Sequence, residues 1–151
     1  MKIKVETNTY PNGQKWYEIP HVNGKRHGLE TFWHDNGQKW HEVPYVNGKK
    51  HGLETFWHDN GQKRCKISYI NGQEHGLSTW WYENGQKWFE SPYVKGQQHG
   101  LITSWHFNSL LSWIQKWHQG QKVWEMSFSS TEQIPEDAEV ELFFHETPEL
   151  I

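Results

Sequence analysis

Apolar and polar positions recur along most of the chain with a period of 24 residues. The glycines show this step most clearly, in the two columns Gly13, Gly37, Gly61, Gly85 and Gly24, Gly48, Gly72, Gly96. Residues 13–36 and 37–60 differ at only 4 of 24 positions. A period of this length predicts an array of stacked supersecondary units in which each unit contacts mainly its neighbours.

Each unit contains two turn signals separated by alternating apolar and polar residues, as between Asn36-Gly37 and Asn47-Gly48. Asn-Gly favours a type I′ turn, because both central residues of that turn need a positive φ. Two-residue turns at both points predict strands throughout and no helix in residues 10–108. We therefore expect an all-β fold, a single-layer elongated antiparallel β-meander of about eleven strands, roughly 50 Å long at ~4.8 Å per strand.

The period also divides the chain into segments. Residues 1–128 form the predicted repeat array, made of an N-terminal cap (1–12), four repeats (13–36, 37–60, 61–84 and 85–108) and a degenerate capping repeat (109–128). Residues 129–151 are expected to be an acidic C-terminal tail, in which the alternating stretch 139–144 either adds an edge strand or stays loose. Atypical terminal units are expected because they cover the open ends of the sheet.

A two-residue turn at Asn36-Gly37 fixes the strand register. It places Trp33 opposite Trp40 and Tyr45 opposite Gly28, with the same pairs in the other repeats. Strand alternation then places Trp33 and Trp40 on one face of the sheet and Phe32, His41 and Lys39 on the other.

This register predicts a ladder of large side chains on one face, which is our candidate partner-binding surface. Its members are Trp33, Trp40, Trp57, Arg64, Trp81 and Trp88. Tryptophan and arginine are enriched at the energetic centres of protein interfaces. The alternative is that the rings serve stability alone, because a sheet with few aliphatic residues needs its aromatic cross-strand contacts.

Composition supports thin layers rather than a thick aliphatic core. Only 34% of residues are hydrophobic, yet 11 Trp, 6 Tyr and 7 Phe make 16% of the chain aromatic. The net charge of -3 hides an acidic tail and a body, residues 1–128, with a net charge of +4. That charge is too small to predict nucleic-acid binding. An acidic partner would complement it.

The cysteine count and the N-terminus bear on localisation. Cys65 is the single cysteine, and no apolar stretch resembles a signal sequence or a membrane span. A cytoplasmic location is therefore expected. Cys65 replaces Tyr17, His41 and Phe89 of the other repeats and is interpreted as a small packing substitute.

No residue pattern indicates catalysis or a cofactor. The serines lie in no nucleophile motif and no paired carboxylates recur, so an enzyme is not expected. The histidine column His27, His51, His75 and His99 suggests a metal site at first. Equivalent residues would lie two strands apart, about 9–10 Å, which is too far to share an ion. We expect these histidines to flank turns, and we expect no bound metal.

The repeat unit itself resembles a known family. Units such as HDNGQKWHEVPYVNGKKHGLETFW resemble MORN repeats, and the closer match is the variant with two Asn-Gly turns found in bacterial YwqK-type antitoxin proteins. The resemblance is strong over residues 10–108 and weaker over residues 109–128. The second glycine of the usual HGxG core is replaced by Glu30, Glu54, Ser78 and Ile102.

This resemblance implies a non-enzymatic β-array that binds a protein partner, with an antitoxin or immunity role in which the partner is a toxin. The alternative implied by other MORN-like arrays is a scaffold or membrane-associated protein that binds anionic lipid. Lipid binding would need a basic face, for which the lysine column Lys15, Lys39, Lys63 and Lys87 is the candidate.

Overall fold

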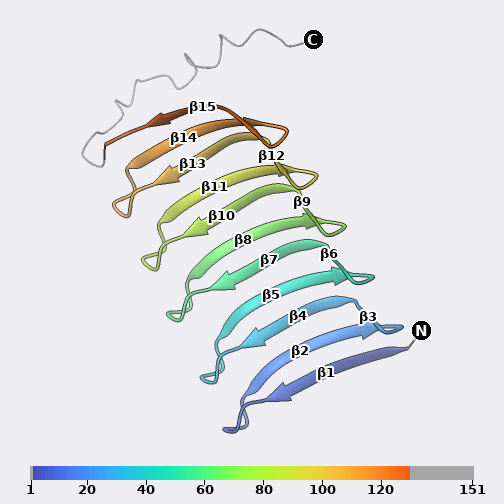
Figure 1. The fold of residues 1–151 in the computed structure, drawn as a ribbon. Coiled ribbons are helices and arrows are strands. Elements are labelled where there is room, and N and C mark those ends of the chain that lie inside the picture. The colour runs from blue at the N-terminus through green and yellow to red at the C-terminus, as the bar shows by residue number, and fades with distance from the viewer. Residues whose placement is uncertain (1, 130–151) are drawn as a thin grey trace.

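The computed structural model describes residues 2–129, which form one antiparallel sheet and contain no helix. Eleven strands lie side by side in chain order (Figure 1). They are β1 (Ile3–Thr9), β2 (Lys15–Val22), β4 (Gly28–Trp33), β5 (Lys39–Val46), β7 (Gly52–Trp57), β8 (Lys63–Ile70), β10 (Gly76–Trp81), β11 (Lys87–Val94), β13 (Gly100–Trp105), β14 (Leu111–His118) and β15 (Gln121–Ser127). The predicted single-layer β-meander is confirmed. The acidic tail beyond Ser129, with its candidate edge strand, lies outside the described residues.

One set of hairpin turns has the expected geometry. Asn23 and Gly24 have φ values of 50° and 79°, and Asn47 and Gly48 have 51° and 83°, as a type I′ turn requires. Each of four such turns leads into a two-residue strand: β3 (Lys25–Arg26), β6 (Lys49–Lys50), β9 (Gln73–Glu74) or β12 (Gln97–Gln98). A histidine then interrupts the strand.

The other set of turns differs from the prediction. Gly37 has a φ of 83° while Asn36 does not have a positive φ. The Gly37 N–H donates to the His34 carbonyl (3.0 Å) and the His34 N–H donates to the Gln38 carbonyl (2.8 Å). This is a three-residue loop, a type I turn followed by a left-handed glycine. The Asn36 side-chain oxygen accepts the Gln38 N–H at 2.9 Å, which stabilises the turn. The predicted type I′ turn at this point is wrong.

A β-bulge follows each of these loops. Trp33 pairs with Lys39 and Phe32 pairs with His41, so Trp40 is an extra residue between the two pairs. The predicted pairing of Trp33 with Trp40 is therefore wrong. The bulge compensates for the extra loop residue, and beyond it the register is the predicted one.

The predicted glycine–tyrosine pairs are confirmed by this restored register. Gly28 pairs with Tyr45 and Gly52 pairs with Tyr69. Both tyrosine rings contact a cation of the preceding turn: the Arg26 guanidinium lies 5.3 Å from the Tyr45 ring centroid. The corresponding distance from the Lys50 ammonium to Tyr69 is 4.8 Å.

The bulge also exchanges residues between the two faces. The Trp40 ring lies 5.4 Å from both the Phe32 and His41 rings, so it shares their face. Lys39 lies on the opposite face, with its ammonium 2.6 Å from Glu42. We call the first the aromatic face; its central row is Tyr17, Phe32, His41, Phe56, Cys65, Trp80, Phe89, Ser104 and Trp113. The second, which carries Trp33, Lys39 and Glu42 with their equivalents, is the lysine face.

Most of the packing lies on the aromatic face. Beside the aromatic row runs a second row in which Val43 and Ser91 are fully buried and Ile102 is 1% exposed. On the lysine face the equivalent leucines, Leu29 and Leu77, remain 43% and 51% exposed. One layer of strands thus buries residues mainly on one side, because large rings there cover the row beside them.

Candidate functional site

The six predicted site residues do not form one ladder. Trp33, Trp57 and Trp81 lie on the lysine face, whereas Trp40, Arg64 and Trp88 are the bulge residues and lie on the aromatic face. The prediction of a common face is wrong. Its cause is the bulge, since one extra residue turns the following side chain to the other side of the sheet.

The lysine face is largely neutralised by its own ion pairs. Three of the four lysines in the predicted column pair with glutamates three residues on: Lys15–Glu18 (2.6 Å), Lys39–Glu42 (2.6 Å) and Lys87–Glu90 (2.8 Å). Lys63 has Lys66 at that distance in the sequence. Its tryptophans also contact lysines, as in Lys15 at 5.1 Å from the Trp33 centroid and Lys87 at 5.6 Å from that of Trp105. A shallow hollow of about 430 Å³ lies between Trp57 and Trp81 beside Lys63.

On the aromatic face, ring contacts run continuously through the second repeat. Trp40 contacts Phe32 and Phe56, and His41 stacks on Phe56 with centroids 4.1 Å apart and planes 16° apart. In the third repeat this run is interrupted, because Arg64 stands in the position of Trp40 and Cys65 in that of His41. Two large rings are therefore missing side by side.

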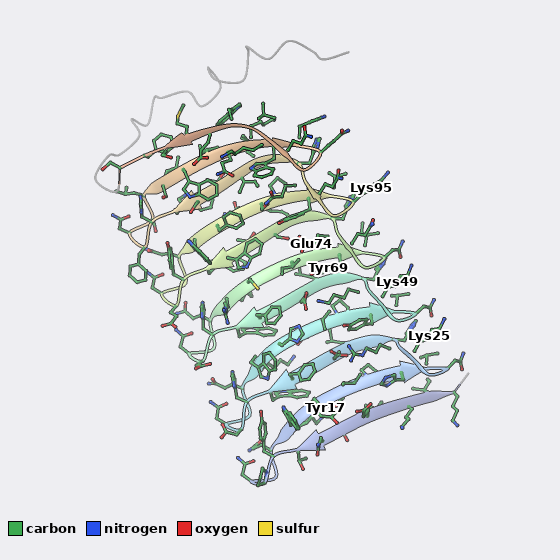
Figure 2. The ribbon with its side chains drawn as sticks, in the orientation of Figure 1. Tyr17, Lys25, Lys49, Tyr69, Glu74 and Lys95 are labelled. Carbon is green, nitrogen blue, oxygen red and sulfur yellow. The ribbon has the colours of Figure 1, made fainter. Side chains whose placement is uncertain are left out.

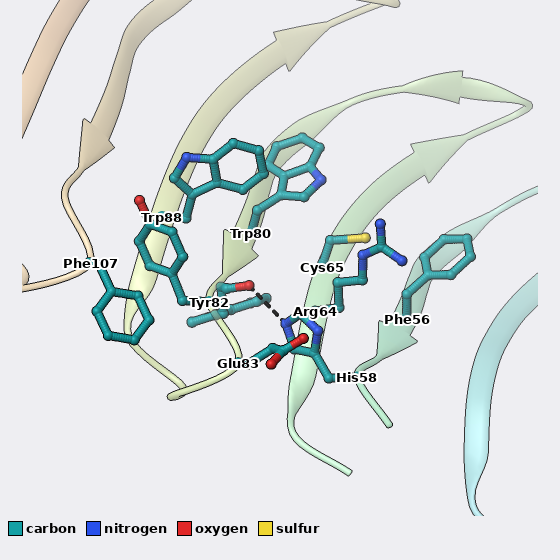
Figure 3. A pocket seen from close by; sticks show the side chains of 10 residues that line it. Phe56, His58, Arg64, Cys65, Trp80, Tyr82, Glu83, Trp88 and Phe107 are labelled. Atoms are coloured by element: carbon teal, nitrogen blue, oxygen red, sulfur yellow. Dashed lines mark hydrogen bonds between the residues drawn. The ribbon is translucent and has the colours of Figure 1, made fainter. Parts of the chain in front are cut away.

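Their absence leaves a hollow of about 650 Å³, which we call the third-repeat hollow. Figure 3 shows Arg64 and Cys65 between Phe56 on one side and Trp80 and Trp88 on the other. Trp88 is 48% exposed, so its ring is open to solvent on the rim. A hollow of this size with apolar walls is typical of a binding site for one or two side chains of a partner.

Hydrogen bonds to the next repeat hold the rim in place. The His58 Nε2–H donates to the Trp81 carbonyl at 3.0 Å, a contact drawn in Figure 3. The Tyr82 hydroxyl donates to the Trp105 carbonyl at 2.9 Å. Side chains that are already fixed lose little conformational entropy when a partner binds.

Cys65 forms part of the lining and is not a reactive thiol. It is 6% exposed, and burial raises the pKa of its thiol to about 11. At neutral pH the thiolate is therefore scarce, and the thiolate is the form that attacks electrophiles. Its burial agrees with the interpretation of Cys65 as a small packing residue.

Arg64 is the charged group of the hollow. Arg64 is an exposed residue, and its side chain makes no hydrogen bond or ion pair within the described range 2–129. Glu83 also lines the hollow but forms no ion pair with it. A guanidinium presents donors in a planar fork that matches a carboxylate. The site therefore combines an unpaired cation with aromatic walls.

Two buried glutamates next to the aromatic row were not expected from the sequence. Glu54 is 2% exposed and accepts from His41 (2.8 Å) and Lys50 (2.7 Å). Glu30 is 4% exposed and lies 3.2 Å from the Arg26 guanidinium. Both occupy the position where the usual MORN core has its second glycine, and that departure was the available signal. Their contacts mark them as structural ion pairs inside the sheet.

The histidine column flanks turns, as predicted. The Nδ1 of His51 accepts the N–H of Asn71, 20 residues later, at 3.4 Å, and His27 and His75 do the same in their repeats. Each histidine thus connects one type I′ turn to the next. In the part of the chain that the structure describes, no group of three or more His, Cys, Asp or Glu residues is arranged for a metal ion.

Comparison with known proteins agrees with this architecture. The family model of the MORN repeat variant matches three consecutive stretches, residues 26–47, 50–71 and 74–95. These repeats and the open sheet define the class of protein, a repeat-type binding module. The comparison with curated proteins gives no match.

A similar solved structure is the "accessory secretory protein 1,2 and 3 in Streptococcus pneumoniae", with 17% identity and a TM-score of 0.39. The match covers 66% of this chain and 18% of that one, so the chain spans less than a fifth of its length. Separately, no helix in residues 2–129 is of the length and apolar character needed to cross a bilayer.

Proposed function

We propose that the protein is a non-enzymatic binding module that holds another protein on its aromatic face. We further propose that this partner is a toxin and that the module neutralises it in the cytoplasm, as an antitoxin or immunity protein. The observation that carries the binding function is the third-repeat hollow, where Arg64 lies without a partner among described residues between aromatic walls.

The position of the hollow supports this use. It lies in the middle of the array, with β1, β2, β4 and β5 on one side and β13, β14 and β15 on the other. Strands far from the ends of an array open least often, so they offer the most rigid platform. Further along the same face Trp16 is 42% exposed, which extends the available aromatic surface.

The charge distribution favours a protein partner over an anionic membrane. Membrane attraction needs several free cations gathered on one face, and three of the four lysines in the column are paired with glutamates. Figure 2 shows Lys25, Lys49 and Lys95 at the type I′ turns along one edge of the sheet. Cations in a single row beside the turns do not form a basic face.

Capture from a lysate of the native host tests the binding function. The baits are the wild-type chain, Trp88→Ala on the aromatic face and Trp57→Ala as a matched control on the lysine face. Circular dichroism and thermal unfolding first establish that all three are folded. We expect Trp88→Ala to lose the partner and Trp57→Ala to retain it. Equal recovery by all three baits would remove the aromatic face as the binding surface.

Co-expression tests the antitoxin role separately. The captured protein is expressed alone and together with the wild-type chain, and growth is measured. We expect the partner to arrest growth alone and the chain to restore it. A harmless partner would exclude a toxin, and salt-sensitive binding to anionic vesicles without protein capture would favour the scaffold alternative.

A further inference from the structure

Strand β8 departs from its equivalents at three consecutive positions. The second repeat reads Lys39-Trp40-His41-Glu42, whereas the third reads KRCK, residues 63–66. Two of these changes remove a ring, and a third replaces the acidic partner of the lysine by Lys66. The changes make this segment both more open and more positively charged than any equivalent segment.

The cations of β8 consequently lack the ion pairs found elsewhere. Lys39 and Lys87 each pair with the glutamate three residues on, at 2.6 and 2.8 Å. Lys63, Arg64 and Lys66 pair with no acidic group in residues 2–129. Lys63 and Lys66 lie on the lysine face, so among the described residues Arg64 is the cation without an ion pair that lines the hollow. Its guanidinium favours a carboxylate on the ligand.

The shape of the hollow indicates the second feature of that ligand. In the second repeat the space is filled by Trp40, whose ring contacts Phe32, His34, His41 and Phe56 at centroid distances of 5.4 to 6.5 Å. In the third repeat Phe56, His58 and Trp80 remain as walls, whereas Cys65 replaces the His41 ring and Arg64 replaces the Trp40 ring. A ring from outside would regain those aromatic contacts, which are each worth about 0.5–1.5 kcal/mol beyond burial.

From these two features we infer that the third-repeat hollow recognises an acidic–aromatic segment of the partner protein. The aromatic side chain of that segment fills the space between Phe56, Trp80 and Trp88. A neighbouring carboxylate pairs with the Arg64 guanidinium through two N–H···O bonds. This inference rests on the proposed protein-binding function and names the chemistry that the binding site selects.

Fluorescence anisotropy with a short labelled peptide tests the inference. The peptide alternates glutamate with phenylalanine and leucine, and a control peptide has glutamine at every glutamate position. The full chain is compared with Arg64→Trp, which restores the residue of the neighbouring repeats, and with Cys65→Phe, which fills the hollow without changing the charge. Lys25→Gln is the matched control, because it removes one exposed charge at a distant turn.

We expect the glutamate peptide to bind wild type and Lys25→Gln with equal affinity. Its affinity for Arg64→Trp and Cys65→Phe should be lower by a factor of at least about ten. The glutamine peptide should bind wild type with an affinity lower than that of the glutamate peptide by a similar factor. Three results would overturn the inference: no binding of the glutamate peptide, equal binding of both peptides, or unchanged binding to the two filled variants.

Vesicles of anionic lipid provide the remaining arm. Vesicle binding that Arg64→Trp abolishes, without peptide binding, would assign the hollow to a lipid headgroup and overturn the inference. The lysate capture distinguishes this failure from failure of the proposed function. A chain that captures a partner through Trp88 but ignores the peptide keeps the function and loses the inferred chemistry.

Discussion

The two buried glutamates show how one residue type acquires opposite electrostatic behaviour at equivalent positions. Burial alone would raise the pKa of Glu54, but hydrogen bonds from His41 and Lys50 hold that pKa below its ordinary value of 4.5. Burial raises the pKa of Glu30 despite the nearby Arg26 guanidinium. The difference arises because Tyr17 stands where the next repeat has His41.

For Glu54 we expect the substitution Glu54→Gln to lower the free energy of unfolding at neutral pH by about 1–3 kcal/mol, because it leaves His41 and Lys50 without their anion. The folded-state pKa is lowered, so the stabilisation is present above pH 4.5 and is lost as the pH falls through the folded pKa. Urea unfolding of both proteins at pH 7 and at pH 3 measures this. An equal deficit at both pH values would contradict it.

For Glu30 we expect the glutamine substitution to raise the free energy of unfolding at neutral pH. A raised pKa means that the folded state favours the protonated acid, so wild-type stability decreases as the pH rises above 4.5. Glu30→Gln removes this charge and should unfold at a higher urea concentration than wild type at pH 7, with the difference vanishing near pH 4. Destabilisation at pH 7 equal to that of Glu54→Gln would show that the Arg26 pair outweighs burial.

At the scale of the strand, the His-Gly step has a steric requirement that a neighbouring proline sets. Gly52 has a φ of +110°, and an added Cβ would lie 2.9 Å from Pro44 Cγ. Gly76 has a φ of +95°, but its added Cβ would lie 3.5 Å from Ser68 Oγ, which is an ordinary contact. In the third repeat an added Cβ would therefore meet no close contact, while the positive φ of the glycine is kept.

Comparing Gly52→Ala with Gly76→Ala separates these two contributions. Both should destabilise through the positive φ, by about 1–3 kcal/mol. Gly52→Ala should cost more, because the methyl group must displace Pro44. Thermal unfolding of the two variants measures the difference, and Pro44→Ser should reduce the cost at Gly52 to that at Gly76. Equal melting temperatures for the two alanine variants would refute the steric argument.

The turns explain why the strands could be predicted but their faces could not. Asn-Gly occurs at both turns of the first three repeats, and it forms a type I′ turn only where it directly follows an apolar strand residue, as at Asn47-Gly48. The other copies follow a proline or an acid, Pro11 or Asp35, which suits the first central position of a type I turn. This extra loop residue requires the bulge, and the bulge decides where Trp40 points. An assumed two-residue turn therefore predicts correctly the residue pairs far from the loop, such as Gly28 with Tyr45, and predicts wrongly the pair next to it, Trp33 with Trp40.

For the whole molecule, the period of 24 residues was sufficient to predict one layer of antiparallel strands in chain order. The position of the hollow could not be predicted, because it depends on two substitutions meeting on one face after the bulge. The sequence singled out Cys65 as a substitute for the aromatic residues of the other repeats, but it placed Arg64 in a ladder with Trp57 and Trp81. Those two tryptophans lie on the opposite face.

The central claim is that Arg64 and Cys65, which replace the rings of the neighbouring repeats, serve partner binding and are not needed for folding. The double substitution Arg64→Trp/Cys65→His, which gives β8 the ring pair of the second repeat, tests it most directly. We expect the melting temperature to stay the same or rise, because the rings would contact Phe56 and Trp80, while partner recovery from the host lysate falls at least roughly tenfold. Full recovery of the partner by this folded variant would contradict the claim.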